Sequence, residues 1–403
     1  MEDSAPNDFF EDEVTEVEDD SLIAESVSSD ARHADLPLET SEAKQSDQTD
    51  PEAQPERKLK IPGPGLGEST VWFLGVFAAQ IFGGIVMFTI LAVILSATNE
   101  FGTGKELLSL IEESYQLELI GGSWLIFVVL AVLGAFVRLG SNPLRKIGIR
   151  KFPKLHALFI VVLILPLSSL AGTLHQQVME IWKRVVEAVP GLQFLDNFNS
   201  MQMLEEFTRE SSLLSLILII AVAPAIAEEV VFRGIIGRGL SARWGVVFGV
   251  VMTSLFFGLA HVHPAHAIAV VPLGMCMHYV YIVTKSFWAP VMLHFLNNSW
   301  AVVATKMINQ GAAPELADNV TVPPEVLIAS AVLVILILIL MWQTRVRYLL
   351  PDGTTWTPGF FTIERPPQKV PVVAHREPVS PGLLALTLCG LVGFGVVFFQ
   401  SAL

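Results

Sequence analysis

Cysteine and charged residues are both scarce in this sequence. Only two of its 403 residues are cysteines, Cys276 and Cys389, and only 16% are charged. Both cysteines lie within apolar runs, and neither stands at a spacing typical of metal ligands, so the sequence indicates no disulfide framework and no cysteine-based metal centre. So low a share of charged residues in so long a chain also argues against an ordinary soluble protein.

A cleavable targeting sequence is absent too. The N-terminus has no basic start followed by an apolar stretch, as a signal peptide needs, and its many acids argue against a transit peptide. Residues 1–60 hold 19 of the 39 acidic residues but only 5 of the 25 basic ones, which accounts for the net charge of −14. We therefore expect residues 1–66 to be a disordered, acidic, cytoplasmic tail, and we expect no nucleic-acid partner.

Long apolar runs are what the sequence has in abundance. Its hydrophobic fraction is 52% and its mean hydropathy is +0.56. Several runs reach the roughly 20 residues that a helix needs to cross a bilayer. We predict an all-α, polytopic transmembrane helical bundle of eight to nine spans, with the lipid bilayer as a partner. The candidate spans are residues 71–97, 119–137, 155–174, 213–236, 244–263, 267–283, 287–305, 325–343 and 381–399.

Basic residues predict the orientation of the chain in the membrane. Six of them follow the second span, between Arg138 and Lys154, and so place that loop in the cytoplasm. Two crossings back, the N-terminal tail is then cytoplasmic as well, at the inner membrane if the protein is bacterial. After the tail we expect three further regions and one polar, loosely ordered loop: an N-terminal membrane region (67–211), a core (212–305), C-terminal membrane additions (306–403) and, within these, the loop (344–380).

Two carboxylates and a guanidinium interrupt the apolar run 212–236. A charge at the centre of a bilayer costs about 3 kcal/mol on insertion scales, so such residues are retained for a reason. Glu229 and Arg233 stand four apart on a helix and can form an ion pair. Glu228 points about 100° away and is left free for acid–base chemistry. A purely structural ion pair is the alternative, although that role needs only one glutamate.

Two further polar pairs follow in the next apolar runs. Phe257 and His261 share one helix face, and so do His294 and Asn298. Each pair alone is also compatible with packing or with interhelical hydrogen bonds. Together with the glutamates, they supply what hydrolysis needs: a carboxylate to take a proton from water, an imidazole to hold that water, and donors for an oxyanion.

The order of these motifs resembles that of a known family. EEVVFR, then FGLAH, then HFLNN is similar to the signature of the CPBP (CAAX protease and bacteriocin-processing, or Abi) intramembrane endopeptidases, which include the Rce1-type CAAX prenyl proteases. The flanking Trp288-Ala-Pro290 is also similar. The resemblance covers roughly residues 212–304, and nothing in residues 1–70 or 306–403 matches.

The resemblance implies a role for each motif residue. Glu228 is the general base that activates water, and His261 orients that water. His294 and Asn298 form the oxyanion site. The remaining motif residues support this arrangement: Glu229, Arg233 and Phe257.

The resemblance leaves the cofactor and the substrate open. The family has been described as metalloproteases, but a metal-free glutamate mechanism is also argued for it. A divalent metal such as zinc, held by Glu229, His261 and His294, is therefore one option, although the sequence has no HExxH motif. It also lacks the GxSG and GxGD motifs of other intramembrane proteases. The substrate would be a membrane-embedded or lipidated protein or peptide, with CAAX-type processing as one case.

Two other classes of function compete with this hypothesis. The chain could be a catalytically silent membrane scaffold or immunity-type protein that kept the motif. It could also be a proton-coupled transporter, but such proteins usually show paired halves, and the sequence has no internal repeat.

A last expectation concerns depth in the membrane. For Glu228 and His261 to meet on antiparallel helices, the turn between them should lie near residue 245. The stretch 212–243 is then long for one straight span, and proline disrupts a helix. We therefore expect a break at Pro224.

Overall fold

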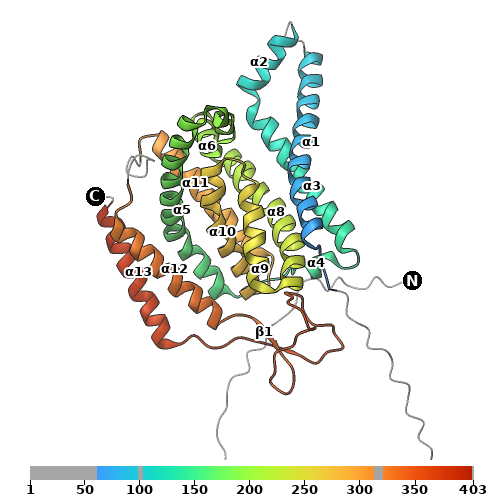
Figure 1. Ribbon diagram of the computed structural model, residues 1–403, viewed down its shortest axis with the longest axis vertical. Coiled ribbons are helices and arrows are strands. Elements are labelled where there is room, and N and C mark those ends of the chain that lie inside the picture. Colours follow the sequence, from blue (N-terminus) through green and yellow to red (C-terminus); the bar gives the residue numbers. More distant parts are fainter. Residues whose placement is uncertain (1–60, 99–102, 313–320, 402–403) are drawn as a thin grey trace, which may run out of the picture. The chain divides into compact units, whose positions relative to one another are not determined.

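Helices make up nearly all of the structure, as the sequence predicts (Figure 1). The computed structural model describes residues 61–98, 103–312 and 321–401. Most of the predicted acidic tail therefore lies outside the described residues, and the described residues belong to one compact unit. The helices and strands in chain order are α1 (Leu66–Thr98), α2 (Gly104–Ser114), α3 (Gln116–Leu139), α4 (Pro143–Lys146), α5 (Lys154–Ala188), η1 (Pro190–Phe198), α6 (Ser200–Glu210), α7 (Leu213–Leu216), η2 (Ile217–Val222), α8 (Ala223–Glu229), η3 (Val230–Gly237), α9 (Arg238–Leu259), α10 (Pro264–Thr284), α11 (Trp288–Asn309), α12 (Pro324–Gln343), β1 (Arg347–Leu349), β2 (Val373–His375) and α13 (Pro381–Ser401).

Seven helices in the described part of the chain are long and apolar enough to cross a membrane. One of them, Leu213–Leu259, has 47 residues and combines α7 to α9. Helix α11 is not among the seven, although the sequence predicts a span there, because its polar side chains lower its hydropathy. The chain is thus a multi-pass membrane protein with a helical bundle fold. Its orientation in the membrane stays a prediction.

The long helical run reverses at Gly245, where the sequence predicts the turn. Gly245 has φ 84° and ψ 170°, a backbone conformation that is essentially restricted to glycine. A Cβ added to Gly249 would lie 2.1 Å from the Ser241 hydroxyl oxygen, although eight residues of one straight helix span about 12 Å. The chain therefore folds back on itself here. Glu228 and His261 lie at similar distances along the chain from this turn.

The expected break at Pro224 is wrong. The backbone stays helical at Val222 and Ala223, and the helix continues through Pro224 into α8. Two π-helical stretches, η2 before α8 and η3 after it, take the place of a break. The wider turns of a π-helix change the hydrogen-bond register, and Pro224 falls in the first turn of the α-helical piece, where a missing N–H is tolerated.

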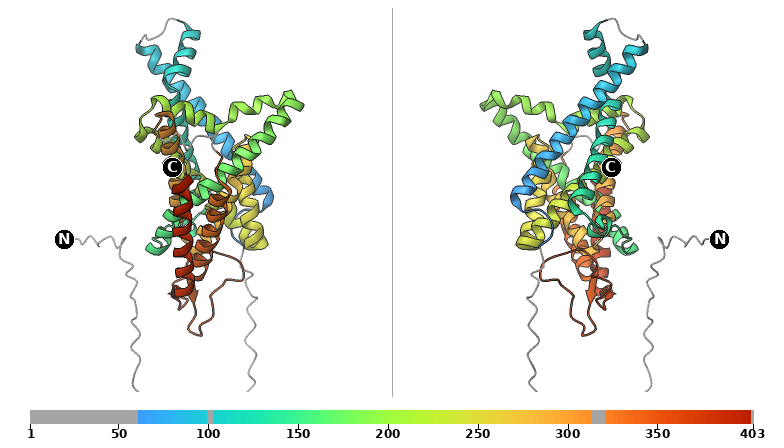
Figure 2. Two further views of the ribbon diagram at one scale, coloured as in Figure 1. Left: turned by 90° about the vertical axis from the view of Figure 1, so that its left-hand side faces the viewer. Right: turned by 90° about the vertical axis from the view of Figure 1, so that its right-hand side faces the viewer.

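Helix α5 is longer than the predicted span. The sequence predicts that it ends at residue 174, but the helix continues to Ala188. Figure 2 shows the end of α5 and the following α6 meeting in a V. The short helix η1 connects them, and Trp182 on α5 donates a hydrogen bond to Asp196 on η1 (2.7 Å). Residues 175–188 thus extend the membrane helix, because nothing in their sequence stops the helix before Pro190.

Residues 344–380 are mostly irregular, as a loop is, but they contain a short strand pair and are hydrogen-bonded to the bundle. Strands β1 and β2 pair antiparallel within this segment. Arg150 fastens the segment to the bundle by donating to the Tyr348 hydroxyl (2.8 Å) and to the carbonyl of Ile363. Arg145 and Lys285 donate to further carbonyls of the segment. The segment is held by hydrogen bonds from the bundle rather than by a core of its own.

Replacement of Gly245 by alanine should destabilise the protein. A Cβ at this φ and ψ costs about 1–3 kcal/mol, so the thermal unfolding temperature of the purified protein in detergent should fall. Gly393→Ala in α13 is the matched control, because a Cβ there meets nothing within 4 Å. An equal shift for both variants would mean that the turn does not depend on glycine.

Candidate functional site

The polar residues of the three motifs come together from different helices. Glu228 and Glu229 end α8, and Arg233 lies on η3. Phe257 lies on α9, with His261 just after its end, and α11 carries His294 and Asn298. The glutamates, Arg233 and His294 are buried, with at most 7% of their surface exposed.

Glu229 links three of these helices through a single oxygen atom. Its Oε1 accepts a hydrogen bond from Arg233 Nη1 (2.5 Å) and another from His294 Nδ1 (3.0 Å). Both Glu229 and Arg233 are fully buried, so the pair is shielded from water. Because a carboxylate can only accept, the shared oxygen fixes the proton of His294 on Nδ1. Neutral His294 then presents the lone pair of Nε2 to the rest of the site.

Arg233 contacts α10 as well as Glu229. Its Nη2 donates to the carbonyl of Gly274 on α10 (3.0 Å), and its guanidinium lies over the Phe257 ring at 4.6 Å. The Met277 sulfur lies 3.5 Å from the same nitrogen. Gly274 and Met277 belong to no motif, and the sequence gives no signal for a backbone carbonyl as the partner of an arginine. Arg233 therefore positions α10 as well as Glu229.

Glu228 differs from Glu229 in having no cationic partner. His294 approaches it without a hydrogen bond, with 3.8 Å between Glu228 Oε2 and His294 Nε2. That separation is too long for a hydrogen bond, and Oε2 has no hydrogen-bond partner among the described residues. Two polar atoms at such a distance can share a water molecule. Glu228 thus lacks the cationic partner that Glu229 has in Arg233, although Oε2 of each glutamate has no hydrogen-bond partner among the described residues.

His261 is held by its own helix end and by a second histidine. Its Nδ1 donates to the carbonyl of Phe257 (3.0 Å), which leaves Nε2 as an acceptor in the neutral ring. The ring of His266 lies 4.5 Å away, and Glu228 acts on His261 electrostatically. His263 is fully buried in the connection before α10, and His266 lies in the first turn of that helix.

Asn298 is hydrogen-bonded to the backbone one helical turn before Pro224. Its Nδ2 donates to the carbonyl of Ile220 (3.1 Å). Ile220 stands four residues before Pro224, and a proline has no N–H to donate to that carbonyl. Asn298 therefore donates to a carbonyl that Pro224 cannot serve in an α-helical register. One N–H of the same amide remains for the oxyanion role that the family resemblance implies.

The site residues do not form a metal centre as they are placed. No group of three or more His, Cys, Asp or Glu side chains is positioned to hold a metal ion within the described part of the chain. Of the ligands considered from the sequence, Glu229 and His294 are hydrogen-bonded to each other rather than aimed at a common point. We therefore derive no step through a metal.

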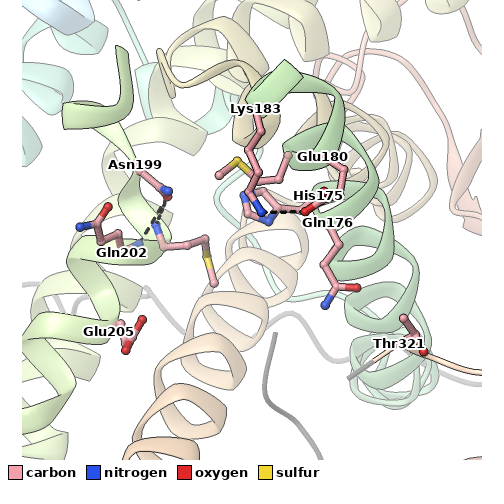
Figure 3. Close-up of a pocket in the computed structure, with 10 residues that line it drawn as sticks. His175, Gln176, Glu180, Lys183, Asn199, Gln202, Glu205 and Thr321 are labelled. Atoms are coloured by element: carbon pink, nitrogen blue, oxygen red, sulfur yellow. Dashed lines mark hydrogen bonds and ion pairs between the residues drawn. The ribbon is translucent and has the colours of Figure 1, made fainter. Parts of the chain in front are cut away.

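A polar cavity of about 470 Å³ lies between α5 and α6 (Figure 3). His175 and Lys183 of α5 face Asn199 and Gln202 across it. The ring of His175 lies 6.1 Å from that of His266, which in turn packs on His261. A row of imidazoles thus leads from this cavity to the motif residues.

Comparison with known proteins confirms the resemblance of the core. Residues 210–300 match the family described as type II CAAX prenyl endopeptidase Rce1-like. A stretch of 88 residues is 27% identical to the protein named "Putative membrane peptidase YdiL" from Bacillus subtilis (strain 168). This stretch covers 22% of the present chain and 36% of that relative. No solved structure matches the chain. The similarity therefore supports a membrane protease of this family, through the core alone.

The buried Glu229–Arg233 ion pair should contribute far more to stability than an exposed pair of the same spacing. Removing one partner of a buried pair costs about 3–5 kcal/mol, because the other charge stays buried. We expect Arg233→Met to lower the unfolding temperature in detergent strongly. Arg209→Met breaks the Arg209–Glu205 pair, which has the same i,i+4 spacing but is more than half exposed, and should cost less than about 1 kcal/mol. Similar losses for both variants would contradict a structural role for the buried pair.

The bond between Asn298 and Ile220 predicts a coupling between Asn298 and Pro224. Asn298→Ala should destabilise the parent, because the carbonyl of Ile220 loses its donor. In a Pro224→Ala background the backbone can supply an N–H, so the same change should cost less. The four proteins of this double-mutant cycle can be compared by thermal unfolding. Strict additivity would show that Asn298 does not compensate for the proline.

Proposed function

We propose that this protein is an intramembrane endopeptidase that hydrolyses peptide bonds of membrane-embedded or lipidated substrates. One observation carries the proposal: Glu228 is a buried carboxylate without a cationic partner, and its unpartnered Oε2 faces His294 Nε2 at 3.8 Å. A second carboxylate beside it already neutralises the arginine. A structural network would need Glu229 and Arg233 but not Glu228.

In the proposed reaction, a water molecule lies between Glu228 and the imidazoles. Glu228 takes a proton from this water while the Nε2 lone pair of His294 or His261 accepts its second hydrogen bond. The oxygen attacks the scissile carbonyl carbon, and the tetrahedral intermediate forms. Glu228 then returns the proton to the amide nitrogen as the C–N bond breaks. No other co-reactant is needed.

The hydrogen bond from His294 to Glu229 alters one role expected from the sequence. With its proton held on Nδ1, neutral His294 cannot donate to an oxyanion from Nε2. The free N–H of Asn298 is therefore the better candidate for the oxyanion, with His294 on the water side. A doubly protonated His294 would restore the original assignment.

The cavity between α5 and α6 offers a polar route to the site. Its lining is hydrophilic and its row of imidazoles leads to His261. We propose that water enters from this side while the substrate approaches from the lipid. Removal of a C-terminal tripeptide from a prenylated protein is one reaction of this class.

Cleavage in proteoliposomes tests the proposal directly. The substrates would be a fluorogenic farnesylated peptide and a library of membrane peptides. Glu228→Gln should lower the rate by about 10²–10⁴-fold, the usual contribution of a general base, and leave thermal stability nearly unchanged. His294→Ala should lower both, because it also removes a hydrogen bond to Glu229.

The controls separate the competing functions. Glu118→Gln changes an exposed glutamate at the start of α3 and should cleave like the parent. A parent that cleaves nothing across the library would contradict the proposal and favour a scaffold, whereas solute flux without cleavage would favour a transporter. Loss of cleavage with a chelator, restored by zinc, would replace the metal-free reaction by a metal-dependent one.

A further inference from the structure

A second cavity lies outside the catalytic motifs, below α10 and α12. Its volume is about 250 Å³. Its walls come from the loop after α10, from the end of α12 and from residues 344–364, so it belongs to the region of β1 in Figure 1. Most of this wall lies outside the residues 210–300 that match the family.

Cations dominate the charged side chains of this cavity. Lys285, Arg345 and Arg347 line it together with a single carboxylate, Glu364. Glu364 is already paired with Arg238 from α9, and Arg347 is paired with Glu377.

Lys285 and Arg345 are the cations left over. Neither forms an ion pair with a carboxylate within residues 61–98, 103–312 and 321–401. Arg150 donates a hydrogen bond to the backbone carbonyl of Lys285 (2.6 Å), so a further positive charge lies beside this lysine. The cavity therefore has an excess of positive charge.

The donors of these cations are only partly used. The Lys285 ammonium donates to the carbonyl of Thr362 (3.2 Å) and has two further N–H bonds. Arg347 has a buried Nε without a hydrogen-bond partner among the described residues. Burial and the neighbouring Arg150 and Arg345 lower the pKa of Lys285 to about 8. An anion in the cavity would accept these N–H bonds and offset the cost of keeping the ammonium charged.

Aromatic residues place the cavity at the edge of the membrane. Trp342 is half exposed at the end of α12, stacks on Tyr279 and carries the Arg345 guanidinium 4.2 Å above its ring. Half-exposed tryptophans at the ends of membrane helices are typical of the lipid–water interface. Basic pockets between membrane helices at such a level suit anionic lipid headgroups.

We infer that this cavity binds the phosphate group of an anionic phospholipid through Lys285 and Arg345. The inference does not depend on the proposed protease function, because it concerns a different set of residues and a different end of α10. Its ligand chemistry, a phosphate, could also come from a soluble compound, so the test includes both sources.

The test measures lipid binding by the full chain purified in an uncharged detergent. A fluorescent phosphatidylglycerol serves as the probe, with unlabelled phosphatidylglycerol, phosphatidylcholine and inorganic phosphate as competitors. Lys285→Met should raise the dissociation constant about fivefold or more, and Lys285→Arg should stay close to the parent. Lys369→Met is the matched control, because this exposed lysine lies in the same segment but does not line the cavity.

Each outcome decides a part of the inference. Competition by phosphatidylcholine as strong as that by phosphatidylglycerol, or equal losses for Lys285→Met and Lys369→Met, would overturn it, because binding would then be diffuse. Displacement by inorganic phosphate at lower concentration than by the lipid would support the anion site and assign it to a soluble phosphate. If Lys285→Met does not fold, Arg345→Gln takes its place with the same expected loss.

Discussion

The rest of the site depends on two hydrogen bonds that one oxygen atom of Glu229 accepts. One atom binds Arg233 from η3 and His294 from α11, and Arg233 extends the connection to α10. A buried charge in a membrane protein is costly, and pairing it with an opposite charge lowers that cost. Once Glu229 has neutralised Arg233, the neighbouring glutamate can remain without a cation. The Glu229–Arg233 ion pair thus leaves Glu228 without a cationic partner.

The backbone around these glutamates is adjusted for the same purpose. An α-helix through Pro224 would leave the carbonyl of Ile220 without a donor, and the structure answers with π-helical turns on both sides of α8 and with the side chain of Asn298. The π-helical turns keep the helix continuous while they change its hydrogen-bond register. As a result Asn298 is tied to the helix that carries the glutamates, and any catalytic role it has uses an amide already oriented by Ile220.

Much of the architecture could be predicted from the sequence, for physical reasons that differ between elements. Apolar runs of about 20 residues have few alternatives to membrane helices, and the turn at Gly245 follows because Glu228 and His261 must lie at equal depth. The pairing of Glu229 with Arg233 follows from their spacing. The effect of Pro224 was not predictable. A proline removes one backbone hydrogen bond, and a helix can respond either by breaking or by shifting to a π-helical register. The partner of Asn298, a backbone carbonyl 78 residues away in the chain, leaves no trace in the local pattern.

The segment after α12 is a second case in which contacts between distant residues leave no local pattern in the sequence. Read alone, residues 344–380 look like a loop, because their order comes from arginines in distant parts of the chain. Arg150 contacts Lys285, Tyr348 and Ile363, so one side chain joins the loop before α5, the loop after α10 and the C-terminal segment. The same basic residues predict the orientation of the chain, which requires only their charge. In the structure, Arg145 and Arg150 donate hydrogen bonds to carbonyls and to the Tyr348 hydroxyl. Among the described residues, the cations without an ion pair at the cavity below α10 and α12 are other residues, Lys285 and Arg345. The basic residues between Arg138 and Lys154 therefore do more than carry charge, because Arg145 and Arg150 also bind the segment after α12.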